Sequence, residues 1–425
     1  MKVNGSAKKR ILLMGINFAP ELTGIGRYTG EMVDWMVKQG YECTVVTSFP
    51  YYPYWKVQAP YQGKYFQKEC SEEGLLTVYR CPMFVPQTPT GLKRVLHELT
   101  FCFTAFLVTF MLLFKPRHDQ IFCMAPPFLL GFLALFYRFF KGGKMLYHIH
   151  DMEIEAARDL KVLNAKQAFK LLFKVERYIL NKTDFVSTVA IGMLKKISKK
   201  VNKQILFFPN WVDTTAFYPH ADKAILKKIW NFESDDKVVL YSGSIGEKQG
   251  LEAIVNIAKD LQHLHHIKFV ISGTGPYKNK LLEKAKTLNL TNLHFLPLQQ
   301  PELFNSFLNM ADLHLVIQKE NACDLMMPSK LNTILAAGGF ALVTANKGTN
   351  LYEIMENYNM GVVIEAENEL VLKIEILKCL QLKAPHFSSN GRTYAEKFLN
   401  IDNILSGILH QMEQVGEAEF ELDVA

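Results

Sequence analysis

Short apolar runs rich in β-branched residues alternate with helical patterns along almost the whole chain, and no other feature limits its fold as strongly. This is the pattern of parallel βαβ units, in which each strand is followed by a helix that packs on the sheet. The runs predicted as strands are 10–16, 42–47, 120–124, 144–148, 185–188 and 205–208 in the first half, and 237–242, 267–272, 293–295, 313–317, 340–344 and 362–364 in the second. The sequence therefore predicts an α/β protein with two doubly wound, Rossmann-like domains in tandem.

The chain of 425 residues is long enough for two such domains. We expect an N-terminal domain over residues 1–210 and a C-terminal domain over residues 211–390. A C-terminal helix over residues 391–412 could pack back on the first domain, and residues 413–425 are predicted as a frayed acidic tail. Ligands of open α/β sheets bind beyond the carboxyl ends of the strands, so two such domains facing each other would hold the chemistry in the cleft between them.

The net charge of +7 is divided unevenly between the two halves. Residues 1–215 carry 29 Lys and Arg against 16 Asp and Glu, a charge of +13, and the remaining residues carry 19 against 25, a charge of −6. A basic first half suggests a polyanionic surface as partner, either nucleic acid or anionic lipid headgroups, and the alternative is a solvated basic face. No RNA- or DNA-binding motif is present, so nucleic acid is not expected as a partner.

Two apolar runs lie in this basic half, over residues 99–114 and 128–140. The first has sixteen residues, is bracketed by basic residues and would span about 24 Å as a helix, which is shorter than a bilayer core. Both runs fit a membrane-surface helix, and both fit core helices packed on a sheet. The basic N-terminus is followed by too short an apolar stretch for a secretion signal, so we expect a cytoplasmic protein, peripheral on the inner face of the cell membrane.

Glycine loops follow several of the predicted strands. Gly24 and Gly26 open a helical run after the first strand, but their spacing to Gly30 does not match a dinucleotide fingerprint. They predict either a floor of backbone amides beneath a phosphate or sugar, or an ordinary glycine turn.

Two further glycine turns follow successive strands in the second half. Gly243 and Gly246 precede Lys248 at a helix start, and Gly273 and Gly275 follow the next strand. A lysine beside free helix N–H groups can bind phosphate without a metal ion. Together the two turns indicate a nucleotide site in this domain.

The string FPNWVDTTAFYP over residues 208–219 resembles the interdomain signature of family 4 glycosyltransferases, which are retaining enzymes of the GT-B fold. Glu176, Thr183, Asp184 and Ser187 match a helix–strand segment of that family, and LYHIHDME resembles its strand ending in His-Asp. The strings GINFAPELTGIGRYTGEM, PYYP, IGEKQGLE and PSKLNTILAAGG are similar to the colanic-acid-type subgroup that acts in exopolysaccharide assembly.

Two positions depart from the family pattern. Ser244 stands where the family usually has an arginine, and Thr333 stands where it usually has a carboxylate of a Glu-x7-Glu pair. A threonine cannot accept two ribose hydroxyls as a carboxylate would. Ser329, Lys330 and the upstream Asp324 are candidates to share the missing roles.

The resemblance assigns roles to residues of this sequence. His150 alternates with His148 along a strand, and we expect one ring to face the core and His150 to reach the strand end beside the donor sugar. Glu21 is either a helix-entry charge or a partner of an acceptor hydroxyl, and residues 49–55 either stack on acceptor sugars or form a packed loop. The expected site residues are catalytic Lys248, His150 and Asp151; donor-binding Gly24, Gly26, Gly243, Ser244, Gly246, Gly273, Gly275, Ser329, Lys330, Leu331 and Thr333; and acceptor-binding Glu21, Tyr51, Tyr52 and Trp55.

The resemblance implies a bacterial enzyme that moves a sugar from a UDP- or GDP-sugar to a hydroxyl of a lipid-linked or oligosaccharide acceptor, with retained anomeric configuration. The product would belong to an exopolysaccharide, capsule or other cell-surface glycan. No cofactor is expected, since the nucleotide sugar is a substrate, and no metal, since no DxD-like pair follows a strand. The alternatives are a nucleotide-sugar epimerase or a phosphorylase on a similar scaffold, and a non-catalytic membrane-binding scaffold.

Overall fold

The computed structural model describes residues 8–71, 73–159, 166–319, 328–382 and 385–422. The chain divides into two compact units. Unit 1 is Met1–Phe208 together with Ile408–Ala425, and unit 2 is Pro209–Gly407.

Unit 1 is built on an eight-stranded sheet in the order β3-β4-β2-β1-β5-β6-β7-β8. Neighbouring strands are parallel except β3, which is antiparallel to β4 at the edge. The strands are β1 (Arg10–Met14), β2 (Glu42–Ser48), β3 (Gln67–Cys70), β4 (Leu76–Cys81), β5 (Gln120–Ala125), β6 (Lys144–Ile149), β7 (Phe185–Thr188) and β8 (Ile205–Phe207).

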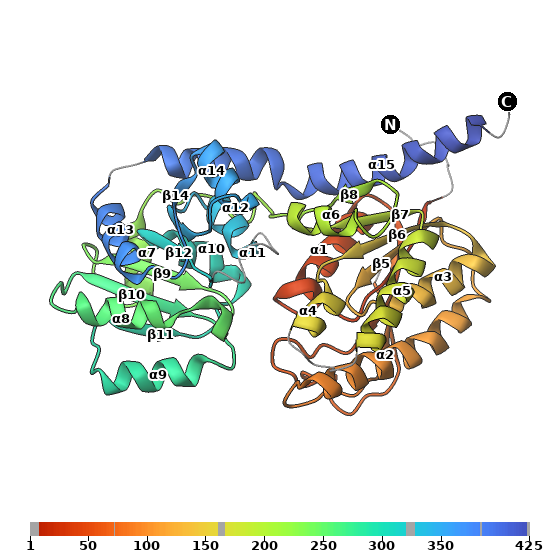
Figure 1. The fold of residues 1–425 in the computed structure, drawn as a ribbon, viewed down its shortest axis with the longest axis horizontal. Helices are drawn as coiled ribbons and strands as arrows, with labels where there is room; N and C mark the ends of the chain where they lie inside the picture. The colour runs from red at the N-terminus through yellow and green to blue at the C-terminus, as the bar shows by residue number, and fades with distance from the viewer. Residues whose placement is uncertain (1–7, 72, 160–165, 320–327, 383–384, 423–425) are drawn as a thin grey trace. The chain divides into compact units, whose positions relative to one another are not determined.

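Helices connect these strands and cover the sheet (Figure 1). One core cluster joins one face of β1, β5 and β6 to buried side chains of the second, third and fifth helices. The helices are α1 (Gly24–Lys38), α2 (Gly91–Leu112), α3 (Leu130–Lys141), α4 (Glu153–Asp159), α5 (Lys166–Lys182) and α6 (Ile191–Ile197).

Unit 2 holds a six-stranded, fully parallel sheet in the order β11-β10-β9-β12-β13-β14. This order, which starts at the centre and grows first to one side and then to the other, is that of a doubly wound Rossmann-like domain. The strands are β9 (Lys237–Ser242), β10 (Ile267–Ser272), β11 (Leu293–Leu296), β12 (Leu313–Val316), β13 (Ala341–Thr344) and β14 (Gly361–Ile364).

Buried side chains line both faces of the second sheet, because successive residues of a strand point to opposite sides. Val238 and Leu240 belong to one cluster, and Val239 and Tyr241 belong to another. The helices that supply the two layers are α7 (Lys223–Ile229), α8 (Glu252–Asp260), α9 (Lys278–Thr287), α10 (Pro301–Asn309), α11 (Ser329–Ala336), α12 (Asn350–Tyr358), α13 (Glu369–Gln381) and α14 (Pro385–Phe398), with the short 3-10 turn η1 (Glu247–Gln249).

Every strand predicted from the sequence is present, and the predicted and observed ends differ by at most two residues. The β3–β4 pair was not predicted. β3 is a partly exposed edge strand with the sequence QKEC, so it has no apolar run to reveal it. Its place at the edge explains why polar residues suffice there.

The last helix, α15 (Ile401–Leu422), begins in unit 2, and its residues from Ile408 onward group with unit 1. Glu413 of this helix forms an ion pair with Lys9, next to β1. Residues 413–422 were expected to belong to a frayed acidic tail, but they are helical. They continue the helix that begins with the apolar residues before them.

Candidate functional site

The strand order of unit 2 puts its topological switch point between β9 and β12, which is where open α/β sheets bind ligands. The loops that follow these two strands meet there, since the backbone N–H of Lys319 donates to the carbonyl oxygen of Lys248 at 2.9 Å. Lys248 is exposed on η1, just before α8. Lys319 was not singled out in the sequence, although it follows a predicted strand as the other candidates do.

The turn at Gly273 and Gly275 packs directly against the turn that follows β9. A Cβ atom on Gly273 would collide with the carbonyl oxygen of Gly243, and one on Gly275 would collide with that of Ile245. The backbone N–H of Ile245 donates to the Thr274 carbonyl at 2.9 Å, which holds the two turns together. These two glycines therefore let one loop approach the other closely, and their expected role in donor binding stays a prediction.

Lys330, near the start of α11, reaches the turn that follows β9. Its Nζ lies 3.9 Å from the centroid of the Tyr241 ring and donates to the Tyr241 hydroxyl at 2.8 Å. That hydroxyl in turn donates to the carbonyl oxygen of Ser244 at 2.7 Å. Burial lowers the pKa of Lys330 to about 7, so an anion at this turn would favour its charged form.

The remaining donor candidates of unit 2 separate into exposed and buried positions. Ser244 and Ser329 are exposed, and the N–H of Gly246 donates to the Gln249 side chain at 3.0 Å. Leu331 is fully buried in the core, and the buried Thr333 hydroxyl donates to the Lys330 carbonyl at 2.9 Å. Both side chains pack inside the unit, and the donor-binding role expected for these two residues stays a prediction.

Asp324, the other candidate for the missing roles, lies outside the described residues.

In unit 1 the switch point lies between β1 and β5, and Glu21 sits in the loop that follows β1. Its carboxylate is buried and accepts hydrogen bonds from the backbone N–H groups of Tyr51 (3.0 Å) and Tyr52 (2.9 Å) and from the Asn17 side-chain amide (2.9 Å). Burial raises the pKa of Glu21 to about 7, and these hydrogen bonds oppose the rise. Glu21 ties two loops together at the carboxyl end of the sheet.

The glycines at the start of α1 are explained by these neighbours. A Cβ atom on Gly26 would collide with the Glu21 carboxylate, and one on Gly24 would lie 3.2 Å from the Tyr52 ring. The start of α1 thus accommodates a carboxylate of the chain itself. Of the two interpretations of Gly24 and Gly26, this packing favours an ordinary glycine turn.

An aromatic cluster follows β2. The buried Tyr51 ring packs edge-on against Trp55, with centroids 5.5 Å apart, and against His97 of α2 at 4.7 Å. The guanidinium of Arg94 lies 5.4 Å from the Trp55 ring centroid. Tyr51 is buried and packs inside the cluster. Tyr52 and Trp55 are half-buried, so these two acceptor candidates have side-chain surface that a ligand can reach.

The rings of His148 and His150 lie on the same side of the chain, with centroids 4.3 Å apart. Both are buried, which corrects the expectation that one faces the core and the other the rim, because residues two apart on a strand point the same way. His148 Nδ1 hydrogen-bonds to the Ser187 hydroxyl at 2.8 Å, whereas His150 Nε2 has no hydrogen-bond partner among the described residues. Burial lowers the pKa of His150 to about 3, so its ring is neutral at pH 7. Asp151, which follows it, is exposed.

Glu98 of α2 and Glu153 of α4 form a carboxyl pair that no sequence pattern indicated. They hydrogen-bond to one another, and Glu153 also accepts from the backbone N–H of Phe128 at 2.7 Å. Burial raises the pKa of both carboxyls, that of Glu98 to about 6, so the pair holds a proton near neutral pH. Fifty-odd residues separate the two along the chain, and only the fold brings them together.

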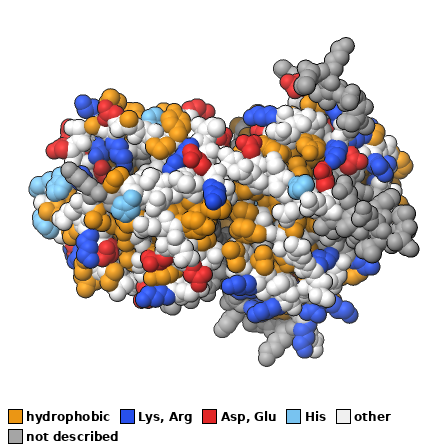
Figure 2. All heavy atoms as spheres, turned by 90° about the horizontal axis from the view of Figure 1, so that it is seen from above, with side chains coloured by type: hydrophobic (Ala, Val, Ile, Leu, Met, Phe, Trp, Pro, Cys, Tyr) orange, Lys and Arg blue, Asp and Glu red, His pale blue; other side chains and the backbone are white. Residues whose placement is uncertain are grey.

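Helix α2, which contains most of the first apolar run, has one buried face and one exposed face. Phe101, Ala105 and Val108 are buried against the sheet, while another face of the same helix is exposed, including Phe103 at 66% and Phe110 at 49%. Among the described residues, α2 is the one helix long and apolar enough to cross a membrane by length and composition, a test that core helices also pass. On the face drawn in Figure 2, by contrast, charged side chains of both signs lie among the hydrophobic ones.

Comparison with known proteins identifies the family. Residues 23–211 match the family model described as "Glycosyl transferase 4-like domain", and residues 222–394 match "Glycosyl transferases group 1". The chain is 36% identical over 411 residues to WcaI of Escherichia coli K12, named as a colanic acid biosynthesis glycosyl transferase, covering 95% of this chain and 99% of WcaI. The protein belongs to this family of glycosyltransferases. The family resemblance given by the sequence motifs is thereby confirmed.

Solved glycosyltransferases share the whole fold with this one at low sequence identity. Sucrose-phosphate synthase from Thermosynechococcus elongatus superimposes with a TM-score of 0.74 at 16% identity, covering 97% of this chain and all of that one. WaaG, a glycosyltransferase of lipopolysaccharide biosynthesis, gives a TM-score of 0.65 at 13% identity, covering 94% of this chain and 98% of that one. The predicted GT-B class, with two parallel-sheet Rossmann-like domains, is confirmed.

Proposed function

We propose that this glycosyltransferase transfers a sugar from a nucleotide diphosphate sugar, with retention of configuration, to a lipid-linked or oligosaccharide acceptor. The proposal is carried by the placement of lysines at the switch point of unit 2: a backbone hydrogen bond joins the loops that hold Lys248 and Lys319, and Lys330 of α11 reaches Tyr241 at the end of β9. A related solved structure, HepE of Anabaena, is described in complex with UDP and glucose and superimposes with a TM-score of 0.67 at 13% identity, covering 96% of this chain and all of that one. These observations support unit 2 as the donor-binding half.

In the proposed reaction, the bond between the anomeric carbon and the diphosphate oxygen breaks and a bond to the acceptor oxygen forms. The acceptor proton leaves with the diphosphate. Lys248 and Lys330 would stabilise the negative charge that develops on the leaving group, so that no divalent ion is needed for this step. Lys330 would supply the positive charge of the family arginine that Ser244 replaces, because its Nζ lies beside the turn that holds Ser244.

We propose that His150, a residue of unit 1, forms a hydrogen bond with the donor sugar. Its Nε2 is buried without a hydrogen-bond partner among the described residues, and such an atom costs free energy unless a ligand pairs with it. Because the ring is neutral at pH 7, its role is to donate or accept one hydrogen bond. Asp151 stands next to it as the second proposed catalytic residue.

The acceptor is proposed to lie against Tyr52 and Trp55, beside the loop that Glu21 holds. Aromatic rings give flat apolar surfaces on which sugar rings stack. The name of WcaI supports an acceptor from exopolysaccharide assembly.

We further propose that unit 1 docks on anionic membrane at the cytoplasmic face. The exposed face of α2 is apolar, and basic side chains lie near both of its ends: Lys93 and Arg94 at the start of the helix, and Lys115 and Arg117 just after it. Such a helix can lie in the interface, with its apolar face among the lipid chains and its cations at the headgroups.

A panel of nucleotide sugars in a thermal-shift assay tests the donor, followed by mass spectrometry of the acceptor. A ligand at 100 times its dissociation constant adds about 2.7 kcal/mol of stability, so the true donor should raise the melting temperature clearly. Transfer predicts an acceptor heavier by one sugar, whereas an epimerase would change the nucleotide sugar alone. Failure of every UDP- and GDP-sugar to stabilise the protein would contradict the proposal.

A further inference from the structure

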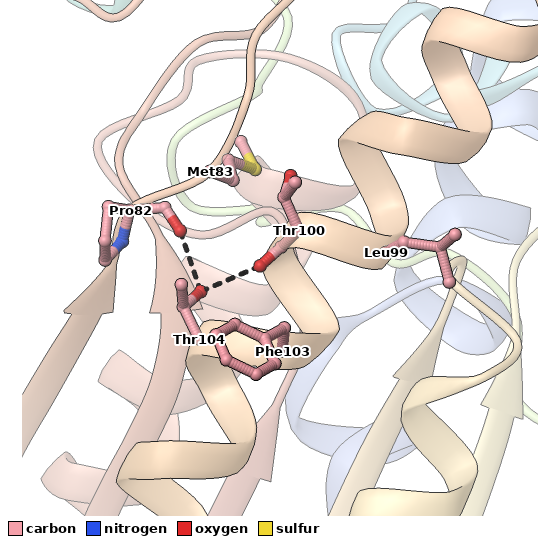
Figure 3. A pocket seen from close by; sticks show the side chains of 6 residues that line it. All are labelled: Pro82, Met83, Leu99, Thr100, Phe103 and Thr104. Carbon is pink, nitrogen blue, oxygen red and sulfur yellow. Dashed lines mark hydrogen bonds between the residues drawn. The ribbon is translucent and has the colours of Figure 1, made fainter.

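An open apolar pocket lies beside the first half of α2 (Figure 3). It is shallow, with a volume of about 410 Å³, and its lining residues are Pro82, Met83, Leu99, Thr100, Phe103 and Thr104. The two threonine hydroxyls are already occupied: that of Thr104 donates to the Pro82 carbonyl at 2.7 Å, and that of Thr100 donates to the His97 carbonyl at 2.9 Å. The pocket therefore offers hydrocarbon surface and little hydrogen-bonding capacity to an occupant.

The pocket opens on the exposed apolar face of α2. Leu99 and Phe103 line it, and their exposed fractions are 45% and 66%. The same face continues along the helix through Leu107 and Phe110. The pocket therefore adjoins further exposed apolar side chains of the same helix.

The other end of the pocket adjoins the aromatic cluster. The Thr100 hydroxyl accepts from the backbone N–H of Phe84 at 3.0 Å, and the carbonyl of Phe84 contacts His97 Nδ1 at 2.6 Å. His97 packs on Trp55 with ring centroids 5.5 Å apart, and the guanidinium of Arg94 lies 5.4 Å from the centroid of the Trp55 ring. The first part of α2, from Arg94 to Thr100, therefore joins the pocket wall to an aromatic ring and a cation.

We propose that this pocket binds the hydrocarbon chain of a lipid-linked acceptor, with Arg94 beside its phosphate. This inference rests on the proposed function and specifies its acceptor. Three neighbouring features match the three chemical parts of such a molecule. Trp55 can stack on the sugar, Arg94 can pair with the phosphate, and the pocket can hold the hydrocarbon chain.

The juxtaposition with Arg94 and Trp55 favours the acceptor over bulk phospholipid as the occupant. A phospholipid that only touches a membrane-bound helix needs no pocket and would contact the whole exposed face equally. A chain attached to a phosphate is instead held at two points, and each point adds to the affinity and fixes the position of the sugar. Burial raises the pKa of Glu98, and both its hydrogen bond to Glu153 and the positive charge of Arg94 oppose that rise.

The test uses farnesyl phosphate that carries a photoreactive diazirine at the far end of its chain, added to the whole protein in solution without vesicles or sugar donor. We expect cross-links in the peptides that hold residues 82–83 and 99–104. The variant pair Leu99→Ser and Phe103→Ser should reduce labelling about tenfold, because it removes the apolar walls. Both side chains are exposed enough that their loss should leave the melting temperature unchanged.

The matched control is the pair Leu107→Ser and Phe110→Ser, which removes similar side chains from the same helix outside the pocket and should change labelling less than twofold. Arg94→Gln should weaken labelling by farnesyl phosphate and leave labelling by the matching farnesol probe unchanged. Equal labelling in the two serine pairs, or cross-links spread evenly over residues 99–114, would overturn the proposal. So would equal competition by dispersed phosphatidylglycerol. The assay contains neither membrane nor sugar donor, so its result does not depend on membrane docking or on sugar transfer. A failure of this inference can therefore be told apart from a failure of the proposed function.

Discussion

At the scale of single residues, Glu21 shows how a loop that shapes a site can depend on pH. Three hydrogen bonds stabilise its carboxylate, but burial outweighs them and raises the pKa to about 7 from an ordinary value of 4.5. The folded state therefore binds the Glu21 proton more tightly than the unfolded state does. This contribution to stability is complete below pH 4.5 and is lost as the pH rises through about 7.

Glu21→Gln should remove that dependence. The shift corresponds to about 3 kcal/mol, so the variant should match the wild type near pH 5 and exceed it in stability at pH 8 by about that order. Glutamine keeps an acceptor for the N–H groups of Tyr51 and Tyr52, and its amide can pair with the Asn17 carbonyl after that side chain turns. Chemical denaturation at both pH values measures the difference. If the stabilities of the two proteins change in parallel with pH, Glu21 does not titrate in this range.

Lys248→Ala should lower turnover with the nucleotide sugar about 100- to 1,000-fold while leaving the melting temperature unchanged. The side chain is exposed and contributes little packing, and loss of one group that stabilises developing charge typically costs this much. Lys259→Ala is the matched control, because Lys259 is exposed on the adjoining helix α8. Full turnover in the Lys248 variant would exclude that lysine from the reaction.

At the scale of elements, sequence patterns predicted the strands well and the contacts between loops poorly. Alternation of apolar runs revealed both sheets, because buried parallel strands need continuous apolar side chains. Aspartates just before β5, β7 and β12 accept the backbone N–H of the first or second residue of a neighbouring strand at 2.7–2.8 Å, as Asp312 does for Val238. Asp184 belongs to this set, so a residue that matched the family pattern has a structural role.

The site was only partly predictable for a physical reason. Lys248 and the glycine turns could be found because each follows a strand in the sequence. The Glu98–Glu153 pair, Lys319 beside Lys248, and the Gly273 turn packed on Gly243 depend on contacts between segments that are distant in the chain. The burial of Leu331 and Thr333 was not predictable either, because a motif match does not say which side of a helix is buried.

Gly273→Ala should destabilise unit 2 by about 2 kcal/mol or more and abolish the thermal shift given by the donor. The glycine has φ of +147°, and a Cβ atom would collide with the Gly243 carbonyl, so the two turns must separate. Gly348→Ala is the control, since Gly348 also has a positive φ, +83°, but nothing lies within 4 Å of its Cβ position. A difference between the two variants isolates the collision from the backbone strain. Similar costs in both would show that the approach of the two turns is unimportant.

The loops of unit 2 also predict activity without a divalent ion. Lysines at the turns after β9 and β12 would supply the positive charge that a metal supplies in other enzymes. We expect the rate of transfer in excess EDTA to equal the rate with magnesium. A rate that EDTA abolishes and magnesium restores would contradict this.

At the scale of the whole molecule, charge and apolar surface are distributed together. Residues 1–215 carry +13 and the rest −6, and the exposed apolar face of α2 belongs to the basic half. A lipid surface could therefore recognise unit 1 in two independent ways. The basic side chains respond to salt, because the Debye length falls to about 3 Å at molar ionic strength, whereas apolar side chains in the bilayer do not.

Vesicle flotation at low and at molar salt should separate these contributions. The wild type should float with phosphatidylglycerol vesicles at low salt and in part at high salt. Lys115→Gln with Arg117→Gln should weaken flotation at low salt, since each cation near an anionic surface is worth about 1 kcal/mol. Leu107→Ser with Phe110→Ser should abolish the fraction that resists salt. Neutral phosphatidylcholine vesicles are the control for charge, and failure to float with anionic vesicles at low salt would mean that the exposed face of α2 does not meet a membrane.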